Sequence, residues 1–294
     1  MSAHGTVDDH TALGRPAGVS EGVVAAAWRD ADECAHDAGV TVRLLDTADE
    51  TIAASDLLAR VWEMENTQSH IDPGMLVALA HFGNYVAGAF RGSELVAVSV
   101  GFFHPPPARA IHSHITGVVR NQIGHGVGRA LKLHQRAWCL ERGLVTITWT
   151  YDPLVARNAY FNLHKLGGRA VEYFPDFYGQ MRDGLNRGQS SDRILLVWEL
   201  TRPWHQRAGR ALPGFAALAR GPIGPTIDLD IPTQVDVVRV ELPEDIEAIR
   251  ARDPAAAREW RAALRRVLTE LLDHGWQLTD FDRLGHYRAE RNLS

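Results

Sequence analysis

The chain has 294 residues, of which 45% are hydrophobic and 23% are charged, and its formal net charge is −5. This length allows one large domain or two modest ones, and the composition is that of a globular protein with a real hydrophobic core. The acidic balance, without any block of Lys and Arg, argues against nucleic acid as a partner, because binding phosphates needs basic surface gathered on one face.

The cysteines and the N-terminus indicate where such a chain would function. Cys34 and Cys139 are the only cysteines, too few for a disulfide framework or a zinc cluster, which favours a reducing compartment. The N-terminus has neither the pattern of a secretion signal nor a stretch of about 20 apolar residues. We therefore expect a cytoplasmic protein that does not insert into membranes. Residues 1–20 show no apolar period, and we expect them to form a flexible tail.

Residues 21–200 alternate between helical and extended periods, and we expect them to form a single β-rich α/β domain. We expect helices where apolar residues recur every three or four positions and strands where they alternate. The expected helices are 21–37, 50–66, 74–82, 126–142 and 155–166. The expected strands are 41–46, 84–90, 94–103, 110–119, 144–151 and 193–200. The second, third and fourth strands follow one another closely, as in an antiparallel meander.

The remainder of the chain is expected to form a connection and a small module. Residues 201–232 are rich in Pro and Gly and predict an irregular connection over the surface. Residues 233–294 predict an α+β module with a strand over 237–243 and a helix that opens at Asp253-Pro254, a typical N-cap followed by an N1 proline. Two short strands, WQLTDF and GHYRAE, close this module.

A glycine-rich stretch, IGHGVGRAL over residues 123–131, separates the meander from the helix 126–142. Glycines at the start of a helix leave several backbone N–H groups pointing the same way, and the helix N-terminus adds partial positive charge. This arrangement attracts a phosphate or pyrophosphate, beside which Arg120 and Arg129 could add charge. The stretch lacks the Lys and hydroxyl of a nucleoside-triphosphatase loop, and the preceding antiparallel strands do not suit a dinucleotide fingerprint. Close packing of the three glycines is the alternative interpretation.

The stretch resembles the phosphate-binding motif of the GNAT acyltransferase superfamily, in which a fourth strand leads into Arg/Gln-x-x-Gly-x-Gly/Ala and a helix. The match runs over Ile123, Gly124, His125, Gly126, Val127, Gly128 and Arg129, preceded by Val118 and Val119. The resemblance implies that backbone N–H groups of this stretch hold the pyrophosphate of coenzyme A. Ile123 stands where the family usually has Arg or Gln, and Arg120 stands where it has Pro.

A second motif, RNAYFNLHKLGG over 157–168, is similar to the family's Asn-x-x-Ala-x-x-x-Tyr-x-x-x-Gly region. Asn158 lies near the position of the family's coenzyme A–contacting asparagine, shifted along the chain. Leu163 occupies the position of the tyrosine that commonly protonates the departing thiolate. Because a thiol has a pKa of about 8.5, the thiolate can leave without an acid.

The resemblance implies a fold class of α/β (α+β) type, with a mixed, mainly antiparallel sheet flanked by helices. It covers residues 40–200 by the order of elements. Phrases such as ELPEDIEAIRARDPAAAREWR in the C-terminal part resemble a longer subgroup of the family, some members of which are associated with N-acylation of amino acids, including succinylation.

Two histidines are the candidate catalytic residues. In a regular strand, His112, His114 and Thr116 share one face, whereas Ile111 and Ile115 share the other. An imidazole titrates near neutral pH and can take a proton from an attacking amine. We favour His114 because it lies nearer the glycines. The alternatives are packing histidines or a metal site, for which the spacing identifies no third ligand.

The remaining candidates would bind the acceptor. Glu63 and Glu65 lie where the superfamily often lines its acceptor pocket, although a solvated helix face is the alternative. Tyr151 and Asp152 lie at the end of an expected strand, and Tyr178 lies in the loop after the last core helix; packing or capping is the alternative for each. His134 and Trp138 fall on the apolar stripe of their helix and are expected in the core.

The residues and the resemblance together predict an acyl-CoA-dependent N-acyltransferase. Its co-substrate would be acetyl-CoA or succinyl-CoA, and its acceptor a small-molecule amine such as an amino acid that attacks the thioester directly. A homodimer is compatible with this prediction. The rival interpretations are an acyl-CoA-binding protein without catalysis and an interaction protein built on a GNAT-like scaffold.

Overall fold

The structure, a computed structural model, describes residues 18–64, 71–179, 189–203 and 214–291. The expected tail over 1–20 lies outside these residues except for its last three positions. The first helix begins at Glu21, where the Ser20 side chain accepts a hydrogen bond from the Val23 backbone N–H.

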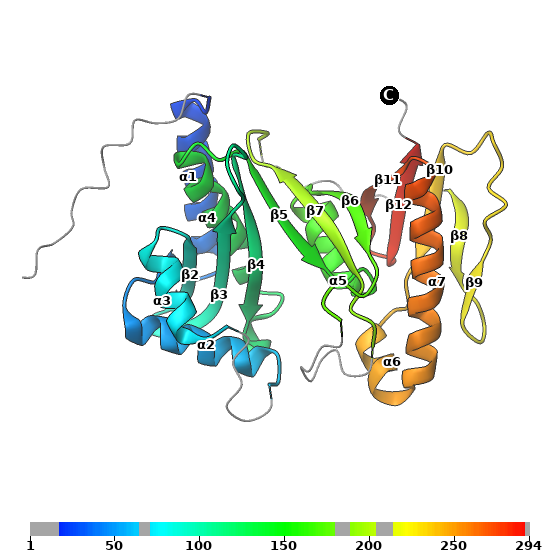
Figure 1. The fold of residues 1–294 in the computed structure, drawn as a ribbon, viewed down its shortest axis with the longest axis horizontal. Helices are drawn as coiled ribbons and strands as arrows, with labels where there is room; N and C mark the ends of the chain where they lie inside the picture. Colours follow the sequence, from blue (N-terminus) through cyan, green and yellow to red (C-terminus); the bar gives the residue numbers. More distant parts are fainter. Residues whose placement is uncertain (1–17, 65–70, 180–188, 204–213, 292–294) are drawn as a thin grey trace, which may run out of the picture.

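A seven-stranded sheet forms the centre of the N-terminal part, with the strand order β1-β2-β3-β4-β5-β7-β6 (Figure 1). All neighbouring strands pair antiparallel except β4 and β5, which run parallel. The strands are β1 Thr41–Leu44, β2 Tyr85–Arg91, β3 Glu94–Phe103, β4 Ala110–Val118, β5 Thr146–Tyr151, β6 Arg169–Phe174 and β7 Arg193–Glu199. The predicted mixed, mainly antiparallel sheet is confirmed.

Helices cover both faces of this sheet. On one face lie α1 and α4, which pack on each other, and on the other face lie α2 and α3 (Figure 1). Their bounds are α1 Glu21–Asp37, α2 Ala48–Val61, α3 Pro73–His81 and α4 Val127–Glu141. Local sequence determines where α2 and α3 begin. Thr47 and Glu50 form a capping box at α2, and Asp72 caps α3 ahead of the N1 Pro73.

Two hydrophobic clusters lie on the two faces of the sheet. The smaller cluster, under α2 and α3, includes Leu57, Leu58 and Ile115. The larger cluster, under α1 and α4, includes Ile111 and continues into the C-terminal part of the chain. Trp138 is buried in the larger cluster, and His134 is buried beside it, where its Nδ1 lies 2.9 Å from the Tyr85 hydroxyl. The expectation that both lie in the core is confirmed.

The helix expected over 155–166 is irregular. It consists of one α-helical turn, α5 Ala156–Ala159, followed by a π-helical segment, η2 Tyr160–Lys165. Strand β6 comes directly after it and was not expected from the sequence. Only six residues long and at the edge of the sheet, β6 pairs with β7 alone, so its short alternating pattern is easily hidden between the two glycines and the following loop.

The C-terminal part forms a second sheet with the order β11-β12-β10-β8-β9. Its strands are β8 Phe215–Arg220, β9 Pro225–Ile227, β10 Val237–Glu241, β11 Trp276–Phe281 and β12 His286–Arg291. The expectation of an irregular connection is therefore wrong for residues 215–227, which form the β8–β9 hairpin; residues 204–213 lie outside the described residues. Pro225 sits at the first position of an edge strand, where a missing N–H is tolerated and where it obscures the strand signal.

Two helices accompany the second sheet: α6 Ile246–Arg252, which was not expected, and α7 Pro254–Asp273. As predicted, Asp253 caps α7, its carboxylate accepting from the Ala255 and Ala256 backbone N–H groups. Helix α7 lies against β6, while β11 lies against η2 and β6. The second sheet thus packs directly on the end of the first (Figure 1).

Candidate functional site

The glycine stretch forms an open turn between β4 and α4. After Val118 the chain makes a short 3₁₀ turn, η1 Arg120–Gln122, and then passes through Gly124 and Gly126, which have φ angles of +89° and +86°. Such positive φ angles favour glycine because a Cβ would crowd the backbone. Gly126 is the N-cap of α4, and Val127 is its first residue.

Packing does not account for these glycines. A Cβ built on Gly124 would meet no atom within 4 Å, and one on Gly128 would lie 3.8 Å from Val118 Cγ2, an ordinary contact. A Cβ on Gly126 would lie 3.5 Å from the Cβ of Ala38, also without a clash. The close-packing alternative is therefore wrong. Gly124 and Gly126 are needed for their positive φ angles. Gly128 needs neither a positive φ nor extra space, so its effect is to place no side chain over the start of α4.

The N-terminus of α4 has the electrostatics of an anion site. In the described part of the chain no side-chain hydrogen bond caps this helix, and its first turn has no acidic residue. The backbone N–H groups at the start of a helix have no intrahelical acceptor, and the helix dipole adds positive potential there. Ile123 and His125 are exposed on the turn, whereas the Val127 side chain is fully buried and can offer only its backbone.

The two arginines expected beside the turn have different positions. Arg120 is almost fully exposed, and its guanidinium lies 3.4 Å from the Glu63 carboxylate. Arg129 donates instead from Nε to the Cys34 Sγ on α1 at 3.1 Å, so its charge is directed at least partly toward α1. Burial raises the pKa of the Cys34 thiol, against the opposing effect of Arg129. The candidate acceptor residue Glu63 thus lies near the end of β4, and Glu65 lies outside the described residues.

Strands β4 and β5 separate beside this turn. Their parallel pairing ends at His112 opposite Thr148, while β4 continues to Val118 and β5 to Tyr151 (Figure 1). We call the point where pairing ends the apex. The register of β4 against β3 also steps from Ile115 to Ser113, so β4 carries one extra residue, His114, just past the apex.

This bulge overturns the expected alternation along β4. Ile111 belongs to the core cluster under α4, whereas Ile115 belongs to the cluster under α2, so the two lie on opposite faces. Thr116 hydrogen-bonds Ser99 at 2.9 Å rather than continuing a stripe of polar side chains. A strict period of two fails across a bulge because the extra residue shifts every later side chain to the other face. His112 and His114 nevertheless remain neighbours, with ring centroids 6.3 Å apart.

A polar cluster surrounds the apex on the face that carries His112. His112 Nδ1 lies 3.0 Å from the Thr148 Oγ1, and His104 Nε2 lies 2.9 Å from the same oxygen. The Phe102 ring packs beside both His112 and His114. Burial, followed by the neighbouring imidazoles and Lys132, lowers the pKa of His112 to about 4, so this side chain is neutral at physiological pH.

Lys132 occupies the opposite side of the apex. From α4 its Nζ donates to the Ser113 hydroxyl at 2.7 Å and lies 4.1 Å from the centroid of the Trp149 ring. Burial lowers the pKa of Lys132 to about 7. Sequence reasoning missed His104, Thr148 and Lys132, because they come from the end of β3, from β5 and from α4, and only the packing of these elements brings them to the apex.

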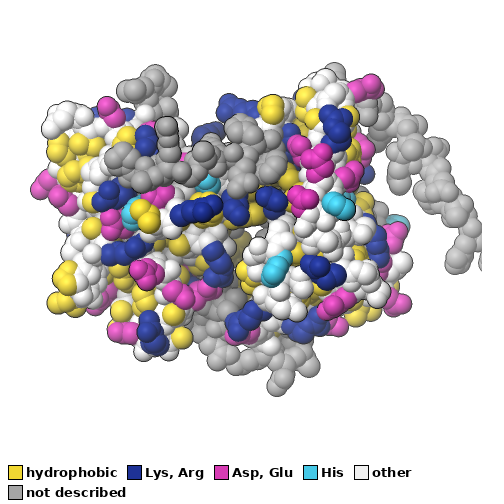
Figure 2. Space-filling model, turned by 180° about the vertical axis from the view of Figure 1, so that it is seen from behind, with side chains coloured by type: hydrophobic (Ala, Val, Ile, Leu, Met, Phe, Trp, Pro, Cys, Tyr) yellow, Lys and Arg dark blue, Asp and Glu magenta, His cyan; other side chains and the backbone are white. Residues whose placement is uncertain are grey.

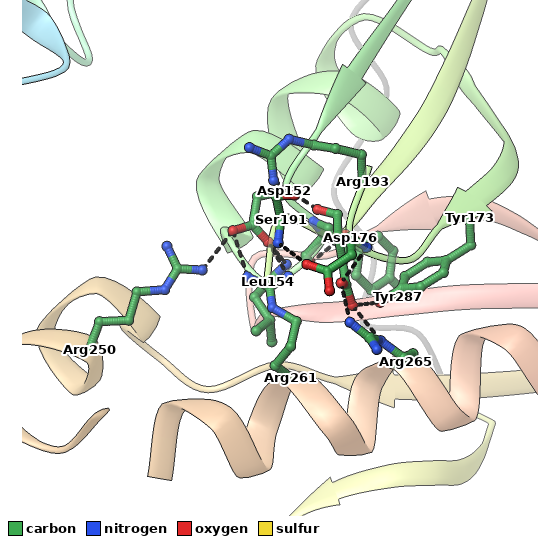
Figure 3. A network of polar contacts seen from close by, with 12 residues as sticks. Asp152, Leu154, Tyr173, Asp176, Ser191, Arg193, Arg250, Arg261, Arg265 and Tyr287 are labelled. Atoms are coloured by element: carbon green, nitrogen blue, oxygen red, sulfur yellow. Dashed lines mark hydrogen bonds and ion pairs between the residues drawn. The ribbon is translucent and has the colours of Figure 1, made fainter. Parts of the chain in front are cut away.

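Tyr151 and Asp152 both lie in buried contacts. The Tyr151 side chain is buried, and burial raises the pKa of its phenol. Asp152 is 8% exposed; its carboxylate accepts two hydrogen bonds from Arg261, at 2.7 and 2.8 Å, and one from Arg250 at 2.6 Å (Figure 3). Burial acts to raise the pKa of Asp152, but Arg261 and then Arg250 outweigh it and hold the pKa well below its usual range.

Tyr178 and Asn158 remain candidates. Tyr178 is 42% exposed, and its hydroxyl lies 3.2 Å from Thr150 Oγ1 near the end of β5. Asn158 is half-buried in α5. Leu163 is fully buried in the core, so the position of the family's tyrosine carries an apolar side chain that packs and cannot act as an acid.

The described residues contain no group of three or more His, Cys, Asp or Glu side chains arranged to hold a metal ion. Among the same residues, no helix is both long and apolar enough to cross a membrane. Basic and acidic side chains are interspersed over the face that carries α1 and α4 (Figure 2).

The structure is similar to solved acetyltransferases over about half of its length. The IAA acetyltransferase from Bacillus cereus is 15% identical, with a TM-score of 0.43 over 54% of this chain and 99% of that one. An N-acetyltransferase from Staphylococcus aureus is 14% identical, with a TM-score of 0.44 over 55% and 98%. An acetyltransferase from Bacillus subtilis, in complex with CoA, is 20% identical, with a TM-score of 0.40 over 54% and 98%. No family model and no curated protein matches the sequence.

Proposed function

We propose that this protein is an acyl-CoA-dependent N-acyltransferase that transfers an acetyl or succinyl group to a small amine such as an amino acid. The observation that carries this proposal is the glycine turn. It presents the uncapped N-terminus of α4 at the end of β4, with glycine at a position, Gly128, where the fold itself does not require one. Such a place suits the diphosphate of a coenzyme A thioester.

The separated strands suit the rest of that substrate. β4 and β5 part on the side of the apex that leads toward Val118 and the turn. Val118 lies four positions along the strand from His114, which corresponds to about 14 Å. A thioester held by its diphosphate at the turn would extend along β4 toward His114 and His112, which lie near the apex.

The chemistry at the apex would be attack of the amine nitrogen on the thioester carbonyl carbon. The new C–N bond forms, an imidazole accepts a proton from the nitrogen, and the C–S bond breaks to release the coenzyme A thiolate. Holding both reactants in contact contributes most of the acceleration, because it removes the entropic cost of their encounter. No acid is needed at the buried Leu163 position, because a thiolate is a tolerable leaving group.

The acceptor would lie near Tyr178 and Glu63, the candidates whose side chains are substantially exposed. We keep Asn158 as a candidate contact to coenzyme A, and we withdraw Tyr151 and Asp152, whose polar groups are buried against the C-terminal part. The homodimer stays a prediction, which the molar mass in solution would check.

The test is release of thiol from acetyl-CoA and succinyl-CoA in the presence of a panel of amino acids and related amines. Amine-dependent release, with the acylated amine identified by mass spectrometry, would support the proposal; reactions without amine measure background hydrolysis. Binding of both thioesters without amine-dependent release across the panel would favour the rival function, a non-catalytic acyl-CoA-binding protein. No binding of either thioester would contradict both functions.

A further inference from the structure

One hydroxyl group joins two imidazoles at the apex. Thr148 Oγ1 lies 3.0 Å from His112 Nδ1 and 2.9 Å from His104 Nε2, both within hydrogen-bonding distance. The Thr148 side chain is held between β4 and β7 and is 7% exposed, so water does not readily replace either contact. His104 reaches it from the end of β3, where its backbone N–H bonds the Ala110 carbonyl at 3.0 Å.

A hydroxyl has a single proton, so Thr148 can donate to only one of the two rings. Thr148 can donate to one imidazole nitrogen while it accepts an N–H from the other. If both contacts are hydrogen bonds of this kind, one of the two facing nitrogens is protonated and the other is not. A change of tautomer at His112 therefore requires the opposite change at His104.

We propose that His112, Thr148 and His104 form a proton relay that carries the proton of the attacking amine away from the reaction centre. This inference rests on the proposed function and deepens it. In the resting state, His112 donates from Nδ1 to Thr148, Thr148 donates to His104 Nε2, and the lone pair of His112 Nε2 is the base.

The transfer balances at every atom. The His112 Nε2 accepts a proton from the amine nitrogen as the C–N bond forms. The His112 Nδ1 proton then passes to Thr148 Oγ1 while the original hydroxyl proton passes to His104 Nε2. His112 ends neutral in its other tautomer, Thr148 is again a hydroxyl, and the positive charge rests on His104 until water removes the proton.

The surroundings of His112 explain why a relay is needed. His104 and His114 face it on its own side of the sheet, and the Lys132 ammonium group acts on it from the α4 side. Burial and these groups disfavour a positive charge on His112, so a proton that stayed there would be held weakly. His104 precedes the exposed prolines at 105–107, which gives the proton a route toward solvent.

The ring nitrogens can be observed without any turnover. We would record ¹⁵N spectra of the histidine rings in the full-length protein at neutral pH, with the signals assigned from His104→Gln and His112→Gln. The relay requires one protonated nitrogen and one unprotonated nitrogen at the two positions that face Thr148. Thr148→Val should change the tautomer populations of both rings, whereas Thr148→Ser should preserve them.

Thr146→Val is the matched control, since it removes a hydroxyl two residues earlier on β5 and Thr146 takes no part in the cluster. It should leave both histidine spectra and the rate unchanged. In the acyltransfer assay, Thr148→Val should lower kcat about 100-fold, the usual size of a proton-transfer contribution, with little change in the KM for the thioester. Thr148→Ser should stay within a few fold of wild type, and His104→Gln should lower kcat as Thr148→Val does.

The outcomes separate the relay from the function. Two protonated or two unprotonated nitrogens facing Thr148 would overturn the relay, as would a Thr148→Val enzyme with a kcat within twofold of wild type. A wild-type protein with opposite tautomers but without acyl transfer to any amine would overturn the proposed function and the catalytic use of the relay, leaving only the hydrogen-bonded histidine pair.

Discussion

The glycine turn and the contact between the two sheets differ in whether the protein supplies hydrogen-bond partners for their polar groups. At the contact, the Asp152 carboxylate is buried and accepts four hydrogen bonds, three from arginines and one from the Leu154 backbone N–H. At the turn, in the described part of the chain, the N-terminus of α4 has no side-chain cap and Gly128 leaves the backbone uncovered. Where the protein supplies all the partners of a buried polar group, removing one of them destabilises the fold. A polar group left open at the surface is available to a ligand.

Removing the buried Asp152 carboxylate at the contact between the sheets should have the largest effect on stability. Asp152→Ala would leave Arg261 and Arg250 buried without their carboxylate, which costs about 3–5 kcal/mol in the free energy of unfolding. Urea denaturation followed by circular dichroism would measure it.

The matched control is the more exposed ion pair between Arg157 and Glu247, whose side chains are 54% and 33% exposed. Arg157→Gln should cost less than about 1 kcal/mol. Equal losses for Asp152→Ala and Arg157→Gln would show that the buried contact is no more important than a surface pair.

The next largest effect is on the pH dependence of stability, to which the buried imidazole of His134 contributes. Burial lowers the pKa of His134 to about 4, below the value of about 6.5 for an unfolded chain. A depressed pKa stabilises the fold above pH 6.5, and this contribution is lost as the pH falls toward 4. We expect His134→Gln to remove this contribution, about 3 kcal/mol between these pH values.

Denaturation at several pH values would check this slope. Exposed His36 supplies the control, since His36→Gln should keep the acid sensitivity of wild type. An unaltered slope in His134→Gln would mean that other groups cause the acid sensitivity.

Removing the candidate base tests the open side of the comparison. We expect His112→Ala to lower kcat by about 100-fold while the affinity for acyl-CoA changes much less, because the imidazole acts at the acyl end and not at the diphosphate. Steady-state rates and calorimetric titration would separate the two quantities. His81→Ala, at an exposed histidine on α3, is the control. A full rate in His112→Ala together with a loss of rate in His114→Ala would make His114 the base and overturn the relay.

The smallest effect is expected at Arg120. Its side chain is 89% exposed, so its attraction for a diphosphate is screened by water and salt. Arg120→Gln should weaken the binding of coenzyme A about threefold at low ionic strength and less in 0.5 M salt. A loss above tenfold would show that a side chain, rather than the backbone, holds the diphosphate.

Periodicity predicted most of the central sheet, but it could not predict the irregular parts. Strand β3 and helix α1 have the bounds expected from their alternation and caps. The bulge at His114 follows from how β4 pairs with β3, and it broke the expected stripe through Thr116. The β8–β9 hairpin was missed because Pro and Gly, which punctuate loops, also begin and end edge strands.

The candidate site also contains one part that could be predicted from the sequence and one that could not. The glycine turn could be found from the sequence because its chemistry lies within seven consecutive residues, 123–129. The cluster of His104, His112 and Thr148 could not, since its members come from β4, from β5 and from the residue after β3. The buried ion pairs of Asp152 could not be predicted from the sequence, because its partners Arg250 and Arg261 lie about a hundred positions further along the chain.

The most direct test of the central claim is calorimetric titration of coenzyme A into wild type, Gly128→Glu and Gly128→Gln. A glutamate near the N-terminus of α4 replaces a poor helix former and suits the helix dipole, so the fold should be as stable as wild type or more stable. The same carboxylate should repel a diphosphate held at that N-terminus. We expect wild type to bind, Gly128→Glu to lose at least tenfold in affinity, and Gly128→Gln to lose less. A folded Gly128→Glu protein that binds coenzyme A as tightly as wild type, or a wild-type protein that does not bind it, would contradict the account.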